Sequence, residues 1–316
     1  MTIASGAADH HRILAAARAW CLERCALATV IETWRSAPSP IGTHMLVHED
    51  GRFIGSVSGG CVEGDVLQHC ADVLGGAPAL VRRYGVEGAA WEVGLPCGGD
   101  IAVFIQPVSA QGFSPDLFAH IEVAHQHGKA LHIASNLQTG ESRVVDGELI
   151  SEAGQFLNTY LPPRHLLIVG AVEIASALSA IAQSMGITVT IIDPRARFLT
   201  PDRFPGVTLD DRWPDEAVAA HQPDSRTAIV VLSHDTKIDD PALIAALASP
   251  AAYVAALGSK AAHDARRARL SSLGVTDTAI DRIEGPAGMK INAITASEIA
   301  LSIAAGMIRV FNLGLR

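Results

Sequence analysis

The chain has 316 residues, of which 49% are hydrophobic and 18% charged, and its formal net charge is −9. This length suits two domains better than one, and the apolar fraction is sufficient for packed cores. The acidic balance argues against nucleic acid as a partner, because binding to a phosphate backbone requires a basic surface.

Cysteine usage and the N-terminus bear on location. The five cysteines all fall within the first hundred residues, and their odd number favours free thiols over a disulfide framework. The first residues are small and polar, without an apolar signal segment, which predicts a reducing, cytoplasmic location. No CxxC pair and no His-Glu-x-x-His spacing occurs, so the pattern does not favour a zinc site.

In chain order, the first half is expected to form an N-terminal α/β domain over residues 1–150. A helix is predicted over 9–26, which would place Cys21 and Cys25 on one face, and a strand over 27–34. An Asp-Gly pair at 50–51 predicts a hairpin. The remaining expected elements are helices over 62–74 and 115–127 and strands over 80–84, 101–107, 130–134 and 142–145. Residues 151–163, which end in two prolines, are assigned to a linker.

Residues 164–316 alternate apolar strands and helices, as expected of a Rossmann-like, doubly wound parallel sheet. The apolar stretch Leu166–Ile192 carries a single charge and superficially resembles a membrane helix. Glycines and serines interrupt it, so a buried strand–helix–strand unit is predicted instead, with no membrane association. Later strands are expected near 207–209, 228–232 and 253–257. A last helix begins at Thr295 with a capping box.

The glycine turn of this Rossmann-like unit is altered. Val172 stands where the second glycine of the dinucleotide fingerprint belongs, and Glu173 brings a negative charge to the helix start. Both changes argue against NAD(P). Asp193 stands 23 residues after Gly170, where it would either hold a ribose hydroxyl or cap its own loop.

Two glycine-flanked thiols are the most informative feature of the sequence. Glycine lets a ligand approach the backbone closely, and a thiolate is a soft metal ligand and a nucleophile. Cys61 is expected where a glycine loop enters a helix, so free N–H groups there would favour an anion. Glu63 would either contact a ligand or stabilise the helix start, and the second role is favoured. The residues concerned are Gly59, Gly60, Cys61, Glu63, Cys97, Gly98 and Gly99.

Polar side chains also follow two strands of the second half. His234 and Asp235 follow one predicted strand, and Ser259 and Lys260 follow the next. Because ligands bind beyond the carboxyl ends of parallel strands, these residues are candidates for a binding rim. The alternative for the first pair is a plain loop, with Asp240 capping a helix that has proline at its first position.

Taken together, the chain resembles the XdhC/CoxI family of molybdoenzyme maturation factors over nearly its whole length. In the first half, the resemblance rests on Ala28-Thr29-Val30, Ser36-Ala37-Pro38, Pro40-Ile41-Gly42, Met45-Leu46-Val47, the stretch from Gly55 to Glu63, and the stretch from Trp91 to Gly99. In the second half, it rests on the strand at Leu166, His234-Asp235, Asp239-Asp240-Pro241, Ala256 to Lys260, Gly285 to Gly288, and Ser297 to Ala300. Relatives carry a Gly-x-Gly-His-type turn where this chain has Val172-Glu173.

The resemblance implies a chaperone more than a turnover enzyme. Such proteins bind the molybdenum cofactor (molybdopterin), protect it while a cysteine desulfurase adds a terminal sulfur, and insert it into a xanthine-dehydrogenase-type apoenzyme. They are often homodimers. On this hypothesis Cys61 or Cys97 contacts the molybdenum or the incoming sulfur. The rival interpretations are an NAD(P)-dependent oxidoreductase and a scaffold that binds no cofactor.

Overall fold

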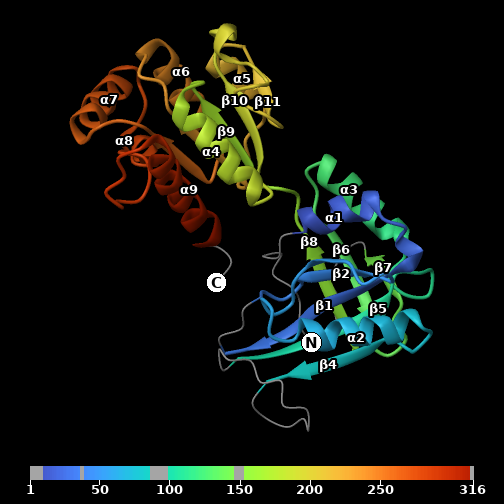
Figure 1. The fold of residues 1–316 in the computed structure, drawn as a ribbon. Helices are drawn as coiled ribbons and strands as arrows, with labels where there is room; N and C mark the ends of the chain where they lie inside the picture. Colours follow the sequence, from blue (N-terminus) through green and yellow to red (C-terminus); the bar gives the residue numbers. More distant parts are fainter. Residues whose placement is uncertain (1–9, 36–38, 86–98, 146–152, 314–316) are drawn as a thin grey trace. The chain divides into compact units, whose positions relative to one another are not determined.

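The computed structural model describes residues 10–35, 39–85, 99–145 and 153–313. The chain divides into two compact units, Met1–Pro162 and Pro163–Arg316, called unit 1 and unit 2 below (Figure 1).

The described part of unit 1 contains two antiparallel sheets. Their strands are β1 (Cys25–Trp34), β2 (His44–His48), β3 (Phe53–Gly55), β4 (Leu80–Tyr84), β5 (Asp100–Pro107), β6 (Leu131–Asn136), β7 (Ser142–Val145) and β8 (Gln155–Tyr160). One sheet has the order β3-β2-β1-β5-β4 and the other the order β7-β6-β8. The β2–β3 hairpin lies where the Asp-Gly pair predicted it, with Met45 opposite Gly55.

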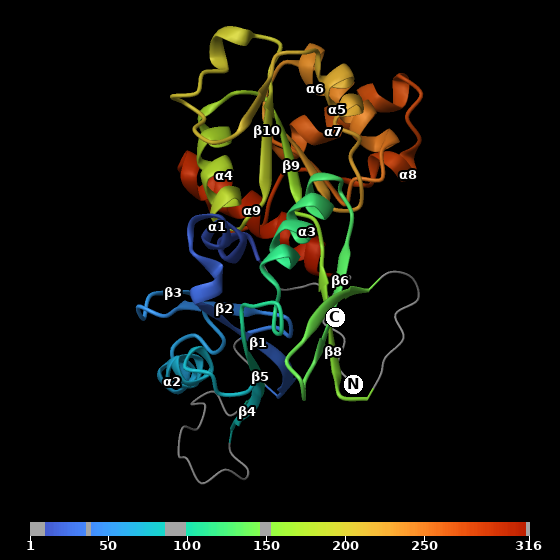
Figure 2. The same ribbon diagram turned by 90° about the vertical axis from the view of Figure 1, so that its right-hand side faces the viewer.

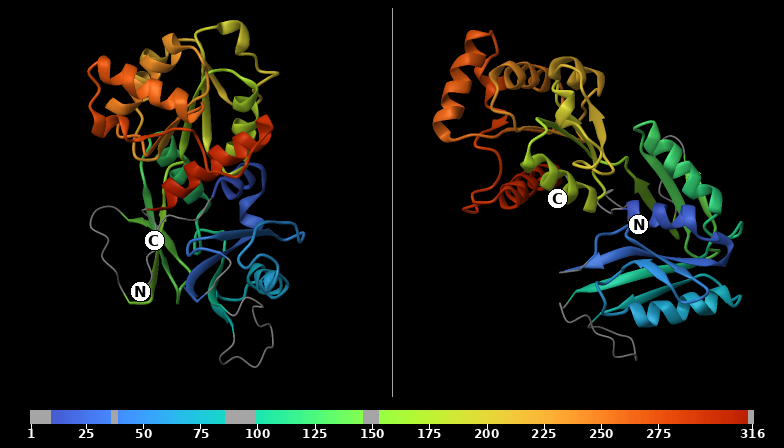
Figure 3. Two further views of the ribbon diagram at one scale, coloured as in Figure 1. Left: turned by 90° about the vertical axis from the view of Figure 1, so that its left-hand side faces the viewer. Right: turned by 45° about the horizontal axis from the view of Figure 1, so that its top comes forward.

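The period-2 alternation of β1 divides unit 1 into layers. Ala26, Ala28 and Val30 face helix α2 (Glu63–Leu74) across one side of the larger sheet. Leu27 points to the other side, toward α1 (His11–Ala19), α3 (Pro115–Gln126) and the smaller sheet. In the right-hand view of Figure 3, the cyan helix α2 lies along one face of the sheet, and α1 and α3 lie on the opposite side.

Two expectations for unit 1 are wrong. The helix predicted over 9–26 ends at Ala19, and Cys25 begins β1, where its carbonyl accepts a hydrogen bond from Val108 N at 2.8 Å. Cys25 is therefore buried in a strand and Cys21 is exposed, so the two thiols share no helix face. Within the predicted linker, residues 155–160 form β8, which pairs with β6. In both places a strand partner distant in sequence decides the local structure.

Unit 2 is built on a parallel sheet. Its strands are β9 (His165–Val169), β10 (Thr188–Ile192), β11 (Thr208–Asp210), β12 (Thr227–Val231), β13 (Tyr253–Ala256) and β14 (Ile283–Glu284). Their spatial order is β11-β10-β9-β12-β13-β14, and every pairing is parallel. Numbered within the unit, this is the 3-2-1-4-5-6 order of Rossmann folds, as the sequence predicted.

Helices cover both faces of this sheet (Figure 2). One face packs against α4 (Glu173–Ser184) and α9 (Ala296–Asn312). The other packs against α5 (Pro214–Ala220), α6 (Thr236–Ala248), α7 (Lys260–Ser272) and α8 (Asp277–Ile280). The apolar stretch 166–192 is β9, α4 and β10, which confirms the strand–helix–strand prediction. Among the described residues, no helix is both long and apolar enough to cross a membrane.

Candidate functional site

The loop that precedes α2 is organised around the carboxylate of Glu63. The carboxylate accepts hydrogen bonds from four backbone N–H groups and two hydroxyls. The donors are Ser56 Oγ (2.5 Å), Val57 N (3.1 Å), Ser58 N (2.9 Å), Ser58 Oγ (2.6 Å), Gly60 N (2.8 Å) and Val62 N (3.2 Å). We call residues 56–63 the Glu63 loop.

The charge of Glu63 is stabilised by these donors. Burial acts to raise the pKa of this carboxyl, but the hydrogen bonds from Ser56 and Ser58 outweigh it and lower the pKa to about 2. The cluster of free N–H groups expected to attract an external anion is therefore occupied by the chain's own carboxylate. Of the two roles considered for Glu63, the structure shows the one that stabilises the helix start.

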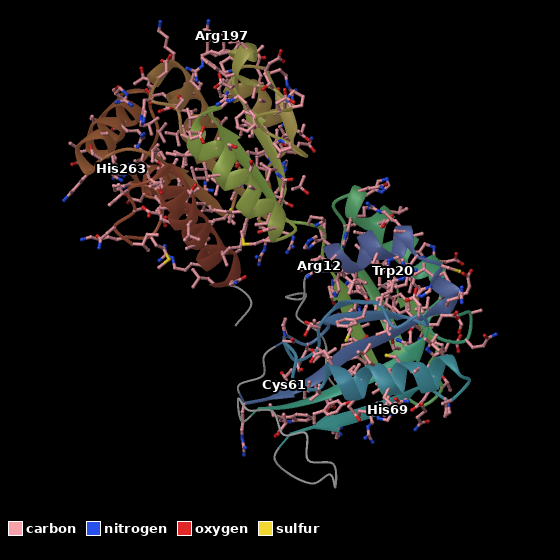
Figure 4. The ribbon with its side chains drawn as sticks, in the orientation of Figure 1. Arg12, Trp20, Cys61, His69, Arg197 and His263 are labelled. Atoms are coloured by element: carbon pink, nitrogen blue, oxygen red, sulfur yellow. The ribbon has the colours of Figure 1, made fainter. Side chains whose placement is uncertain are left out.

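The same loop leaves Cys61 exposed. Its N–H donates to Ser58 Oγ at 3.0 Å, while the thiol is free and faces solvent. Gly59 and Gly60 have φ of +78° and +117°, and a Cβ at either position would meet nothing within 4 Å. These glycines serve the backbone conformation, because positive φ strains other residues. Figure 4 shows Cys61 at the start of α2.

The second glycine-flanked thiol falls largely outside the described residues. Cys97 and Gly98 are among the residues that the structure does not describe. Gly99 is buried immediately before β5.

In unit 2, the four polar residues predicted at the rim follow neighbouring strands. His234 and Asp235 come after β12, Ser259 and Lys260 come after β13, and all four are exposed. Two of them cap helices: Asp235 Oδ1 accepts from Lys237 N at 3.0 Å, and Ser259 Oγ accepts from Ala262 N at 3.2 Å.

The cap predicted at Asp240 is wrong. Helix α6 begins five residues after Val231, at Thr236, with Asp235 as its cap, and Pro241 lies inside the helix. Asp240 is instead buried and pairs with Arg269 at 2.9 and 3.1 Å. Because the Asp240 carboxylate pairs with Arg269, the cap of α6 is Asp235 and not Asp240.

Behind this rim lies a buried polar layer that was not predicted from the sequence. Ser233 Oγ donates to Asp239 Oδ1 at 2.5 Å, and burial raises the pKa of Asp239 to about 6. Arg266 donates to Leu257 O at 2.7 Å. Its Nε and Nη1, and Nδ1 of His263, have no hydrogen-bond partner among the described residues. The sequence spacing could have indicated this layer, because His263 and Arg266 are three residues apart on the face of α7 that buries Leu270.

The altered Rossmann turn is held by Asp193, which is fully buried. Its carboxylate accepts from Ala171 N at 2.8 Å and from Arg195 N, Nε and Nη2 at 2.9, 2.8 and 2.8 Å. Burial acts to raise the pKa of Asp193, but the bonds from Arg195 and Ala171 outweigh it and lower the pKa. Asp193 thus caps its own loop, the second of the two roles considered for it.

Gly170 has φ +107°, and a Cβ there would lie 2.7 Å from Ser233 N. The turns after β9 and β12 therefore approach too closely for any other residue. Among the residues that the structure describes, no group of three or more His, Cys, Asp or Glu side chains is placed to hold a metal ion.

These features define a class of protein with two domains. An antiparallel domain with an exposed thiol precedes a Rossmann-type domain, in whose turn Val172 replaces a glycine and Asp193 accepts from the backbone. Two family models match the chain, "XdhC Rossmann domain" over residues 166–307 and "XdhC and CoxI family" over residues 22–85. The chain belongs to the XdhC/CoxI family.

Similar proteins agree with this assignment. The chain is 30% identical over 285 residues to the molybdenum cofactor insertion chaperone PaoD of Escherichia coli (strain K12), a match that covers 88% of this chain and 81% of PaoD. It is 25% identical to a probable xanthine dehydrogenase subunit from Bacillus subtilis (strain 168), over 91% and 93% of the two chains. A crystal structure of a protein described as a xanthine dehydrogenase, from Bacillus halodurans, has the same fold, with a TM-score of 0.81, 23% identity and 95% of each chain covered.

Proposed function

We propose that this protein binds the molybdenum cofactor, protects it while a cysteine desulfurase adds its terminal sulfur, and inserts it into a xanthine-dehydrogenase-type apoenzyme. The family assignment and the similarity to PaoD support the insertion role. When bound, the cofactor would supply a sulfur-ligated molybdenum centre, and the protein's own task would be to hold and release it.

The observation that carries the proposal is the exposed thiol of Cys61 on the Glu63 loop. A sulfur-rich molybdenum centre is a soft partner, which a cysteine thiolate suits. The hydrogen bonds to the Glu63 carboxylate fix the conformation of the loop, so the Cys61 thiol is held in an exposed position at the helix start. Cys97 is proposed as a second thiol for the same cargo, with Gly98 and Gly99 beside it.

The phosphate of the cofactor requires donors elsewhere. Four N–H groups of the Glu63 loop are already satisfied by its carboxylate, and a second anion there would be repelled. The rim residues His234 and Lys260, which are exposed, are proposed to contribute to cofactor binding in unit 2. A homodimer is part of the proposal, because relatives of this family are often dimeric.

The test is co-expression in a host that makes the cofactor. Purified protein is oxidised, and the fluorescence of the released pterin is measured per protomer. We expect pterin in the wild-type protein and activation of an added apoenzyme by it. Wild-type protein without pterin would refute the proposal, whereas pterin without transfer would refute only the insertion step.

A further inference from the structure

Unit 2 contains a pocket of ≈ 420 Å³ at the carboxyl ends of β9 and β10. It is lined by Ala171, Val172, Arg195, Arg197, Phe198 and Arg203. Three of these residues are arginines, in a chain whose net charge is −9. Figure 4 shows Arg197 at the upper edge of the unit.

The arginines are oriented by their neighbours. Asp193 holds Arg195 through Nε and Nη2, both at 2.8 Å. Arg203 donates to Phe198 O at 2.7 Å and to Ala171 O at 3.0 Å. Each of these guanidinium groups therefore keeps N–H groups that its protein partners do not use, since arginine has five.

The ring of Phe198, which also lines the pocket, packs against two of these arginines. The guanidinium carbons of Arg195 and Arg197 lie 4.8 and 5.0 Å from the centroid of the Phe198 ring. Arg197 is exposed, so its planar group is accessible to a ligand. Asp193, Asp235 and Asp239 all act on Arg195, so the positive charge available to a ligand comes mainly from Arg197 and Arg203.

The adjoining turn limits what fits this pocket. Val172 and Glu173 occupy the positions where a dinucleotide's pyrophosphate would approach, and Asp193 is committed to its own loop. We propose that this pocket binds the phosphomonoester group of a small aromatic ligand. A mononucleotide and the phosphorylated tail of a pterin cofactor share this chemistry, and only the second source rests on the proposed function.

The test compares ligands that differ by one phosphate. Flavin mononucleotide and riboflavin are titrated into the purified protein and followed by fluorescence anisotropy, with 2′-AMP and adenosine as competitors. We expect saturable binding of flavin mononucleotide, at least roughly tenfold weaker binding of riboflavin, and competition by 2′-AMP alone. Arg195→Gln and Arg197→Gln should each weaken flavin mononucleotide binding about tenfold.

Arg212→Gln is the matched control. Arg212 donates to Asp210, at the end of β11, through N, Nε and Nη2 at 3.1, 2.9 and 2.5 Å. Arg195 donates to Asp193 through the same three groups, but Arg212, unlike Arg195, does not line the pocket. Arg197→Gln alters an exposed side chain, so it tests phosphate binding in the pocket even if Arg195→Gln folds poorly.

Equal binding of the two flavins, equal effects of Arg195→Gln and Arg212→Gln, or no saturable binding of either phosphate ligand would overturn the proposal. Pterin retention by the Arg197→Gln protein, measured after co-expression, distinguishes the two sources. Loss of pterin assigns the pterin tail to the pocket, and unchanged retention assigns a mononucleotide. Wild-type protein without pterin would refute the proposed function and leave the flavin comparison intact.

Discussion

Two loops of this molecule each bury a carboxylate against a backbone turn, but the side chains beside the two carboxylates differ. In unit 1 and in unit 2, a glycine-containing turn leads into a twelve-residue helix, and in both a buried carboxylate accepts from backbone N–H groups of the turn, four of them in unit 1 and that of Ala171 in unit 2. Glu63 is surrounded by neutral donors, and the group left exposed beside it is a thiol. Asp193 is paired with a cation, and the groups left beside it are guanidiniums.

The groups beside each carboxylate determine what each unit can recognise. Where a carboxylate of the chain already satisfies the amides of a turn, as in the Glu63 loop, the turn no longer binds an anion, and recognition depends on the side chains around it. In the two binding proposals above, those side chains would recognise a soft centre in unit 1 and a hard oxyanion in unit 2.

The largest loss of stability is expected for substitution of Glu63. In Glu63→Gln, the amide has only one acceptor oxygen and gains two donors that face other donors. We expect the free energy of unfolding, measured by denaturant titration, to fall by about 4 kcal/mol. Glu173 is the matched control, because it is also the first residue of its helix but is exposed. Glu173→Gln should change stability by less than about 0.5 kcal/mol, and similar losses in both variants would contradict the account.

The ion pair between Asp193 and Arg195 in unit 2 is expected to contribute somewhat less to stability. Asp193→Asn breaks a buried ion pair and weakens the bond to Ala171 N, so we expect a loss of about 3 kcal/mol by the same measurement. Asp210→Asn breaks a similar ion pair with Arg212, whose side chain is 47% exposed, and alters the contact between Asp210 and His221 Nε2 at 3.0 Å, and it should cost about 1 kcal/mol. A larger loss for Asp210→Asn would refute the role of Asp193 in holding the turn.

The smallest effect is a pH response of opposite sign in the two units. Glu63 has its pKa lowered from 4.5 to about 2, so the stability it contributes is complete above pH 4.5 and is lost as the pH falls toward 2. Asp239 has its pKa raised from 3.8 to about 6, so it favours unfolding increasingly as the pH rises between those values. Relative to Asp239→Asn, wild-type stability should fall by on the order of 2 kcal/mol from pH 4 to pH 7. A flat difference across that range would contradict the burial of an ionisable Asp239.

Much of the fold could be predicted from sequence because the signals are local. Apolar strands alternating with helices indicated the parallel sheet of unit 2, and the capping box at Thr295 marked the start of α9. Strand β8 and the early start of β1 depend on partners far along the chain. Periodicity within a window cannot detect such pairing.

The candidate site was harder to predict than the fold. Sequence spacing placed Cys61 at a helix start, but it did not reveal that Glu63 turns back to occupy the amides. The alternative of a helix cap at Asp240 rested on the proline that follows it, whereas the carboxylate of Asp240 pairs with Arg269, 29 residues later. Side-chain direction and long-range ion pairs decide these roles, and neither is encoded in spacing alone.

The central claim is that the thiol held by the Glu63 loop serves the molybdenum cofactor. Its most direct measurement is pterin retained per protomer after co-expression, compared between Cys61→Ser and Cys21→Ser. Cys21 is an exposed thiol outside this loop and provides the matched control. We predict that Cys61→Ser loses most of the pterin and that Cys21→Ser retains the wild-type amount. Equal retention by the two variants would contradict the claim.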